Sequence, residues 1–477
     1  MKHFSVLMFS LLLLPCVLFA GGLEDADYTT PDSWSQHLTA DGFKMQAVQH
    51  DILGGSMDMS LTTRYRYLAN DYANDQNIYQ YLRMRYSDAK LGSGTVSGAL
   101  FFRAAHDIDG RNGKHWGDNR YYFYDDILDA ETDDNESASR LYQGYLKFSG
   151  VVKNTELTLG RIYVDRIDTF QLDGADAQLS FLDSKVKLFA FGGRPVSFYV
   201  DTDDDSVYGG GVELAPLNGL KLRGVFSSLD ISDDTKDLQK VRADYSFNGS
   251  SVYGEYGQVD SDGYYKLGGV YRYNPTKTTL SVNYEELLDS IGKENGYYVS
   301  NPLTYTLYPY GDYKKVKVRI SQGITEHVVV GAGVEYKNAN GYELDNRDYK
   351  KYTAYLDLAR IPSKNTYISF NVDYWDVDST SYGKSDKSVT FGGQLTQVVS
   401  DNLDIWLGSR FERFEYDVED DETKDWIQTH YLGCQYTLNN RISITGDVSL
   451  EKSEILERDS TDFDQNLIAE VWLNISI

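Results

Sequence analysis

Apolar and polar residues alternate along most of the chain after residue 55. The clearest case is the last segment, where every second position is apolar: Leu467, Ala469, Val471, Leu473, Ile475 and Ile477. The intervening positions of this segment include Glu470, Asn474 and Ser476. The ranges 57–67, 315–320, 351–358 and 442–451 show the same period of two. Such a period predicts β-strands with one apolar and one polar face, and it indicates an all-β fold.

Short turn signals separate the predicted strands at ten places. They are Leu91-Gly92, Lys153-Asn154, Asp183-Ser184, Asn218-Gly219, Asn248-Gly249, Asn274-Pro275, Thr325-Glu326, Ser363-Lys364, Asp401-Asn402 and Asn439-Asn440. Longer polar stretches lie between them, at 107–139, 193–206, 287–311, 377–387, 416–425 and 452–466. Membrane β-barrels alternate in this way, with short turns on the periplasmic side and long loops outside.

Ten short turns make eleven hairpins if both chain ends lie on the short-turn side, which predicts about 22 strands within a range of roughly 16 to 24. We therefore expect a single transmembrane antiparallel up-and-down β-barrel over residues 56–477, with short periplasmic turns and long extracellular loops. A β-solenoid would need a fixed repeat, whereas the spacing of the short turns varies, for example 26 residues from 249 to 275 and 50 residues from 275 to 325. An array of β-sandwiches would show linkers between domains and would not need this alternation.

The N-terminus has the order of a secretory signal. A basic start, Met1-Lys2-His3, precedes a mostly apolar run over 4–19 and the small-residue patch Ala20-Gly21-Gly22. This order predicts a signal peptide over residues 1–20, cleaved after Ala20. Residues 21–55 are then expected to form a periplasmic N-terminal segment.

Composition narrows the class of protein further. The chain has 477 residues, 72 acidic against 46 basic side chains, and a net charge of −26, which argues against nucleic acid as a partner because phosphates would be repelled. Its two cysteines, Cys16 and Cys434, exclude a disulfide scaffold, a cysteine-based zinc site and an iron–sulfur cluster. Lipidation of Cys16 is an alternative, but Pro15 before it fits a lipidation box poorly. The chain contains no C-x-x-C-H motif, so we expect no haem and no other cofactor of its own.

The polar face of each strand should line the lumen if the apolar face contacts lipid. On the first three strands the polar face contains five basic residues: Arg64, Arg66, Arg83, Arg85 and Arg103. On later strands it carries acids: Glu285, Glu335, Asp357, Asp373, Glu412, Asp447 and Glu470. A basic sector facing acids around the rest of the wall would orient dipolar solutes and tune ion selectivity. Alternatively, the arginines pair with neighbouring acids or an inward-folded loop, and a one-residue register slip would reverse the assignment.

Motif searches reveal no catalytic set. There is no G-x-S-x-G elbow, no H-E-x-x-H, no GxxxxGK[ST] and no GxGxxG between a strand and a helix. His430 shares the apolar parity with Leu432, and His327 lies at a turn, so neither suits a buried triad. We therefore expect no enzyme activity.

The acidic stretch 107–139 is expected either to fold into the lumen opposite the arginines or to form an outer loop bound to divalent cations and lipopolysaccharide.

Three segments resemble bacterial outer-membrane porins: Leu159-Gly160-Arg161-Ile162-Tyr163-Val164, Phe170-Gln171-Leu172-Asp173-Gly174-Ala175 and Phe191-Gly192-Gly193-Arg194-Pro195-Val196. With the segments at 75–82 and 106–110, the chain more specifically resembles the porin-like barrels that sheathe multihaem cytochromes in metal-reducing delta-proteobacteria. The likeness covers roughly residues 56–200 at motif level. The chain departs from porins at its end, where Ile477 replaces the usual Phe.

Two functions follow from the pattern and the resemblance. The first is an outer-membrane porin-like channel for small hydrophilic solutes or ions. The second, implied by the resemblance, is a structural barrel that sheathes a multihaem cytochrome in a trans-outer-membrane electron conduit. Both place the chain in the outer membrane of a Gram-negative bacterium, with membrane lipid and lipopolysaccharide as partners. The second adds a periplasmic or lumenal multihaem cytochrome.

Overall fold

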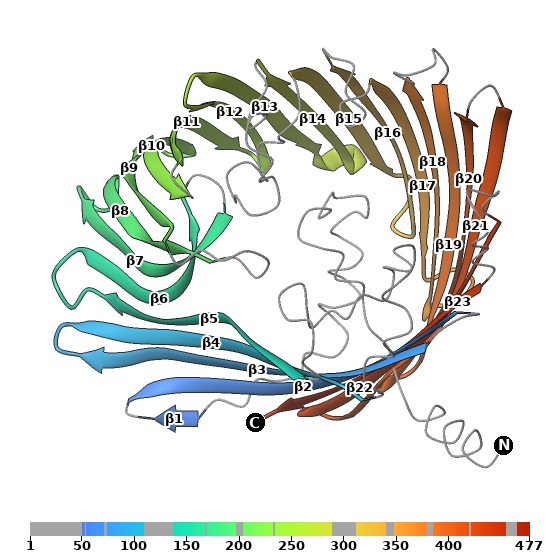
Figure 1. Cartoon of the computed structure of the whole chain (residues 1–477), viewed down its shortest axis with the longest axis horizontal. Helices are drawn as coiled ribbons and strands as arrows, with labels where there is room; N and C mark the ends of the chain where they lie inside the picture. The colour runs from blue at the N-terminus through green and yellow to red at the C-terminus, as the bar shows by residue number, and fades with distance from the viewer. Residues whose placement is uncertain are drawn as a thin grey trace.

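In the computed structural model the chain forms one antiparallel sheet that closes on itself (Figure 1). The structure describes residues 50–52, 54–70, 74–108, 137–166, 169–196, 204–231, 234–288, 312–339, 348–378, 385–418, 421–454 and 465–477. The strands are β1 (His50–Ile52), β2 (Gly55–Asn70), β3 (Asn74–Leu91), β4 (Gly94–Asp107), β5 (Ser137–Ser149), β6 (Thr155–Asp165), β7 (Thr169–Phe181), β8 (Val186–Pro195), β9 (Ser206–Leu217), β10 (Leu220–Ile231), β11 (Asp234–Phe247), β12 (Ser250–Val259), β13 (Asp262–Tyr273), β14 (Thr278–Leu287), β15 (Tyr313–Gly323), β16 (Val328–Ala339), β17 (Tyr349–Ala359), β18 (Thr366–Asp378), β19 (Ser385–Ser400), β20 (Leu403–Val418), β21 (Asp421–Asn439), β22 (Ile442–Glu454) and β23 (Gln465–Ser476).

The ring closes between β2 and β23. Their register runs from Ser60 opposite Ser476 to Asn70 opposite Asn466, while the other edge of β2 pairs with β3. β1 pairs with 55–57 at the start of β2 and lies outside the ring. Among the described residues the sheet has 23 strands, so 23 less β1 leaves 22 strands in the barrel. The predicted all-β, up-and-down barrel of about 22 strands is confirmed.

All ten predicted short turns join consecutive strands at one end of the barrel, which is the end where β2 begins and β23 ends. Asn248 and Gly249, between β11 and β12, have φ angles of 47° and 77°. A two-residue type I′ hairpin needs positive φ at both central residues, which Asn and Gly adopt at low cost. A short 3-10 helix, η2 (Asn274–Thr276), makes the turn between β13 and β14.

The opposite end of the barrel differs from the prediction. The expected long connection at 416–425 is wrong, because β20 runs to Val418 and β21 resumes at Asp421. Connections of only two or three residues also join β2 to β3, β6 to β7, β10 to β11 and β12 to β13. Polar residues can continue a ladder of backbone hydrogen bonds beyond the apolar band, so polarity alone does not mark where a strand ends.

Several predicted segments lie outside the described residues. They are the signal peptide at 1–20, most of the N-terminal segment at 21–55, and most of the expected connections at 107–139, 193–206, 287–311, 377–387 and 452–466. Residues 50–52 of the N-terminal segment are described as β1.

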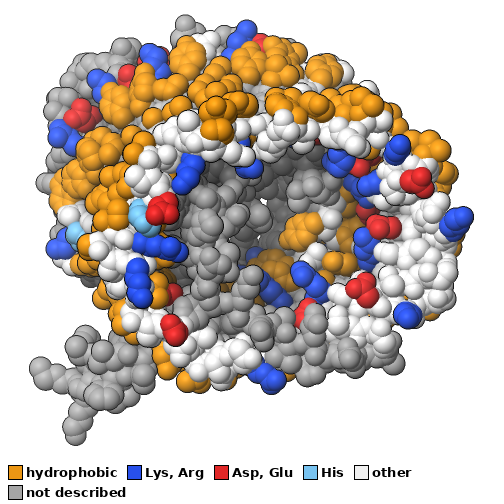
Figure 2. Space-filling view, turned by 180° about the vertical axis from the view of Figure 1, so that it is seen from behind, with side chains coloured by type: hydrophobic (Ala, Val, Ile, Leu, Met, Phe, Trp, Pro, Cys, Tyr) orange, Lys and Arg blue, Asp and Glu red, His pale blue; other side chains and the backbone are white. Residues whose placement is uncertain are grey.

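Hydrophobic side chains cover the outer face of the barrel. Phe370, Leu407 and Leu432 are each about half exposed, and similar residues recur at every second position around the wall. Figure 2 shows these side chains over the outer surface and charged side chains along the rim and inside the opening. The arrangement matches the apolar outside and polar inside of a transmembrane β-barrel.

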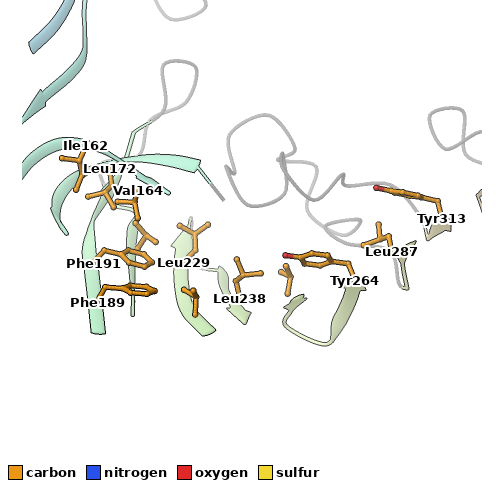
Figure 3. Close-up of a cluster of buried hydrophobic side chains, with 13 residues drawn as sticks. Ile162, Val164, Leu172, Phe189, Phe191, Leu229, Leu238, Tyr264, Leu287 and Tyr313 are labelled. Carbon is orange, nitrogen blue, oxygen red and sulfur yellow. The ribbon is translucent and has the colours of Figure 1, made fainter. Parts of the chain in front are cut away.

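A buried apolar cluster nevertheless lies on the inner face, near the end opposite the short turns (Figure 3). Its members come from β6 to β15: Ile162, Val164, Leu172, Phe189, Phe191, Val207, Val225, Leu229, Leu238, Val259, Tyr264, Leu287 and Tyr313. Phe189 alternates with the exposed Leu188, and Val225 alternates with the exposed Phe226. The inner wall is therefore apolar in part, a feature that the sequence pattern did not single out.

Tyrosine rings pack on glycines of the neighbouring strand on the inner face. Tyr431 lies directly opposite Gly408, and a Cβ atom added to this glycine would clash with the ring. Gly331 opposite Tyr355 and Gly257 opposite Tyr264 repeat the arrangement. The absence of a side chain on these glycines lets the rings lie flat against the wall, where they fill space that would otherwise stay open.

Candidate functional site

The five arginines of the predicted basic sector lie on one face of β2, β3 and β4. We refer to Arg64, Arg66, Arg83, Arg85 and Arg103 as the arginine sector. The opposite face of β4 and β5 includes Gly98 and the exposed Leu146, which are paired in register. The strand alternation therefore turns the arginines toward the inside of the ring.

Two members of the arginine sector meet an acid at the seam of the barrel. Arg64 on β2 forms an ion pair with Glu470 on β23, and Arg66 Nε lies 3.3 Å from the same carboxylate. The guanidinium of Arg64 also lies 4.7 Å from the centre of the Trp472 ring. In the same seam Thr62 donates a hydrogen bond to Asn474 at 2.7 Å. One carboxylate therefore partly offsets the positive charge of two arginines.

Aromatic rings form a continuous series beneath the arginines. Tyr81 is central, because its ring stacks on three others with centroid distances of 6.1 to 6.4 Å: Trp472, Phe101 and Tyr79. Phe101 in turn stacks on Tyr142 of β5 at 4.9 Å. Such rings hold the guanidinium groups over their faces by cation–π attraction, as Phe101 does for Arg83 at 4.5 Å.

The remaining three arginines have no acidic partner among the described residues. Arg83 and Arg85 are exposed, and Arg103 is only 5% exposed. Arg103 lies 5.7 Å from the ring centres of both Tyr79 and Tyr142. The sector therefore keeps an excess of positive charge on its stretch of the wall.

The predicted acids also lie on the inner face, and besides Glu470 three of them are paired. Glu285 lies 3.0 Å from Lys315 and 3.8 Å from Lys266. Glu335 lies 3.4 Å from Lys317, and Glu412 lies 3.0 Å from Arg410 on its own strand. Their charges are therefore offset locally.

Asp357, Asp373 and Asp447 have no ion pair with any described residue. Asp447 on β22 lies directly opposite Glu470 on β23, so two acids face each other beside the arginine sector. One carboxylate oxygen of Asp357 is buried without a hydrogen bond. These three acids come from β17, β18 and β22, whereas the uncompensated arginines come from β3 and β4. Asp357 and Asp373 thus lie away from the arginine sector, whereas Asp447 lies next to it.

A second basic group occupies the inner face of β15, β16 and β17, and the sequence analysis did not select it. Its members are Lys315, Lys317, Arg319, Lys337 and Lys351. Lys337 Nζ lies 4.8 Å from the Tyr313 ring, and Lys351 Nζ lies 4.5 Å from the Trp375 ring. The signal for this group was the same alternation, with 315, 317 and 319 on the polar parity. A single basic sector facing acids elsewhere is therefore an incomplete description of the wall.

The described part of the chain shows neither a metal cluster nor a membrane-spanning helix. No group of three or more His, Cys, Asp or Glu side chains there is arranged to hold a metal ion. No helix of the same residues is long and apolar enough to cross a membrane. His430 is exposed next to Leu432 in the strand alternation, as the sequence pattern predicted.

No protein-family model matches the chain, and no curated protein is detectably similar to it in sequence. The crystal structure of Pseudomonas aeruginosa OpdK with vanillate is 12% identical, with a TM-score of 0.46 over 88% of this chain and 99% of that chain. Acinetobacter baumannii OccAB1 is 10% identical, with a TM-score of 0.43 over 91% and 98%.

Proposed function

We propose that the chain is a porin-type outer-membrane channel that passes small hydrophilic solutes or ions. The closed ring of 22 strands, with an apolar outer face and a charged inner face, supports a lipid-embedded barrel with a polar lumen. The expected export signal at 1–20 agrees with this location. The partners are then outer-membrane lipid, lipopolysaccharide and the solutes themselves, and no catalytic step is involved.

The observation that carries the proposal is the uncompensated charge of the arginine sector. Arg83, Arg85 and Arg103 bring three positive charges to one part of the wall, and no acid of the described residues pairs with them. Charged side chains that line a pore attract ions of the opposite sign and repel the others. We therefore expect the sector to favour anions, and the unpaired Asp357 and Asp373 on β17 and β18 to favour cations on another part of the wall.

The cytochrome sheath remains the alternative hypothesis from the sequence. The barrel has room for a guest, because barrels of this strand number enclose a wide lumen. Nothing in the described residues favours a haem protein over small solutes.

The purified chain in a planar lipid bilayer separates the two functions. Stable, stepwise ion conductance supports the channel. A barrel that is closed or unstable alone, and that copurifies with a haem protein from its source membrane, supports the sheath. Haem content is read from the Soret absorbance of the same preparation, so both outcomes are recorded on one sample.

A further inference from the structure

The guanidinium of Arg103 presents an unused pair of parallel donors. Its side chain is 5% exposed, and its Nε and Nη2 atoms are buried without a hydrogen-bond partner. These two atoms form one edge of the guanidinium plane, the edge that binds two oxygens of an anion at once. Leaving two donors of a buried charged group unpaired costs free energy, because neither water nor protein replaces the lost hydrogen bonds.

The surroundings of Arg103 add positive charge and aromatic faces. Arg140 of β5 lies directly opposite Arg103 in the register, and like charges in that position destabilise a sheet. The rings of Tyr79 and Tyr142 flank the guanidinium, each with its centre 5.7 Å away. Arg64 lies 5.4 Å from the Tyr79 ring and so adds a further positive group nearby. On the same face of β4, the next acid toward the strand end is Asp107, beyond Ala105.

We infer that the free edge of Arg103 is a binding site for an oxyanion that enters the lumen. An oxyanion places two oxygens at the spacing of Nε and Nη2, whereas a halide offers a single centre and uses the fork poorly. Binding would satisfy both donors. The site lies on the inner face, so its ligand comes from the aqueous lumen and not from the lipid. The inference rests on the proposed channel function, which gives the anion its route.

The test compares two arginine-to-lysine variants. Arg103→Lys keeps the positive charge and removes the two-donor edge, while Arg410→Lys makes the same change at an exposed inner-face arginine on β20. Inorganic phosphate is titrated into purified protein in detergent and binding is measured by calorimetry. A second titration is made against a constant high concentration of chloride.

We expect phosphate to bind the parent chain, to bind Arg103→Lys at least about tenfold more weakly, and to bind Arg410→Lys as it binds the parent. Equal binding by the parent and by Arg103→Lys would overturn the inference, as would chloride competing as well as phosphate. Far-UV circular dichroism of each variant shows that the barrel is intact. If channels conduct in a bilayer but phosphate does not bind, the Arg103 site fails and the channel stands. If phosphate binds but no channels form, the channel function fails instead.

Discussion

Arg64 on β2 and Glu470 on β23 form an ion pair across the seam where the barrel closes, although 406 positions separate them in the sequence. Arg66 approaches the same carboxylate, so the last strand supplies one acid for two arginines of the first barrel strand. The pair therefore has two consequences. It holds the ends of the barrel together, and it lowers the net charge of the arginine sector.

Replacing Glu470 with Gln should weaken the seam. The side chain of Glu470 is 13% exposed, so the substitution leaves Arg64 and Arg66 partly buried without their acid. We expect a loss of about 1–3 kcal/mol in the free energy of unfolding, between the values typical of surface and buried ion pairs. Urea unfolding in lipid vesicles, followed by tryptophan fluorescence, measures the change.

Glu412→Gln is the matched control for the seam. Glu412 pairs with Arg410 on its own strand, and the arginine is 57% exposed, so this pair joins no two strands. Its loss should change stability by less than about 0.5 kcal/mol. Equal effects of the two substitutions would show that Glu470 does not act as a link between β2 and β23.

The assignment of side chains to the inner and outer face of the wall can be tested at two adjacent positions on β22. Val448 is on the outer face, opposite Leu432 of β21, and Ser449 is on the inner face, opposite Tyr431. An arginine facing lipid near the middle of the membrane costs about 2–4 kcal/mol. Val448→Arg should therefore destabilise the barrel by that amount in vesicles, while Ser449→Arg should cost clearly less. The reverse order would mean that the register is shifted by one residue.

The packing of tyrosine on glycine predicts a steric effect at Gly408. A methyl group there would push the Tyr431 ring away and disturb its hydrogen bond to Gln394, which has an oxygen–oxygen distance of 3.1 Å. We expect Gly408→Ala to destabilise the barrel by about 1–3 kcal/mol, as overpacking does elsewhere. At Gly224 the nearest atom to an added methyl is 3.9 Å away, so Gly224→Ala should be close to neutral. Similar stability of both variants in vesicle unfolding would argue against a tight ring contact at Gly408.

The sequence predicted the parts of the fold that depend on local physics. The turn at Asn248-Gly249 was predictable because these residue types accept positive φ, and the parity of Leu473 and Glu470 was predictable because lipid and water face opposite sides of a strand. The end of β20 at Val418 was not, since polar strands can pair outside the membrane without an apolar signal.

The site was predictable to a similar extent. Alternation placed Arg64 and Glu470 on the same face, but it did not show that they meet, because their contact depends on the register between β2 and β23. The free edge of Arg103 was also invisible in the sequence, since it depends on which side chains the fold brings within hydrogen-bond distance of it. Lys315 and Lys337 could have been found from the same parity that gave the arginines.

Freeing the seam arginines should also alter ion selectivity. With Glu470→Gln, Arg64 and Arg66 lose their compensating charge, so the lumen becomes more positive. Reversal potentials in a potassium chloride gradient should shift toward stronger anion preference relative to the parent chain. The shift should be larger near 0.1 M salt than near 1 M, because the screening length falls from about 10 Å to about 3 Å. No shift at the lower salt would contradict this placement of charge.

The central claim is that the barrel is a channel whose arginine sector selects ions. Its most direct test is the reversal potential of single channels in a planar bilayer, for the parent chain and for the variant in which Arg64, Arg66, Arg83, Arg85 and Arg103 are all replaced by Ala. We expect stable conductance in both and a shift toward cations in the variant, carried mainly by Arg83, Arg85 and Arg103. Reversal potentials that stay the same, or a parent barrel that conducts no ions, would contradict it.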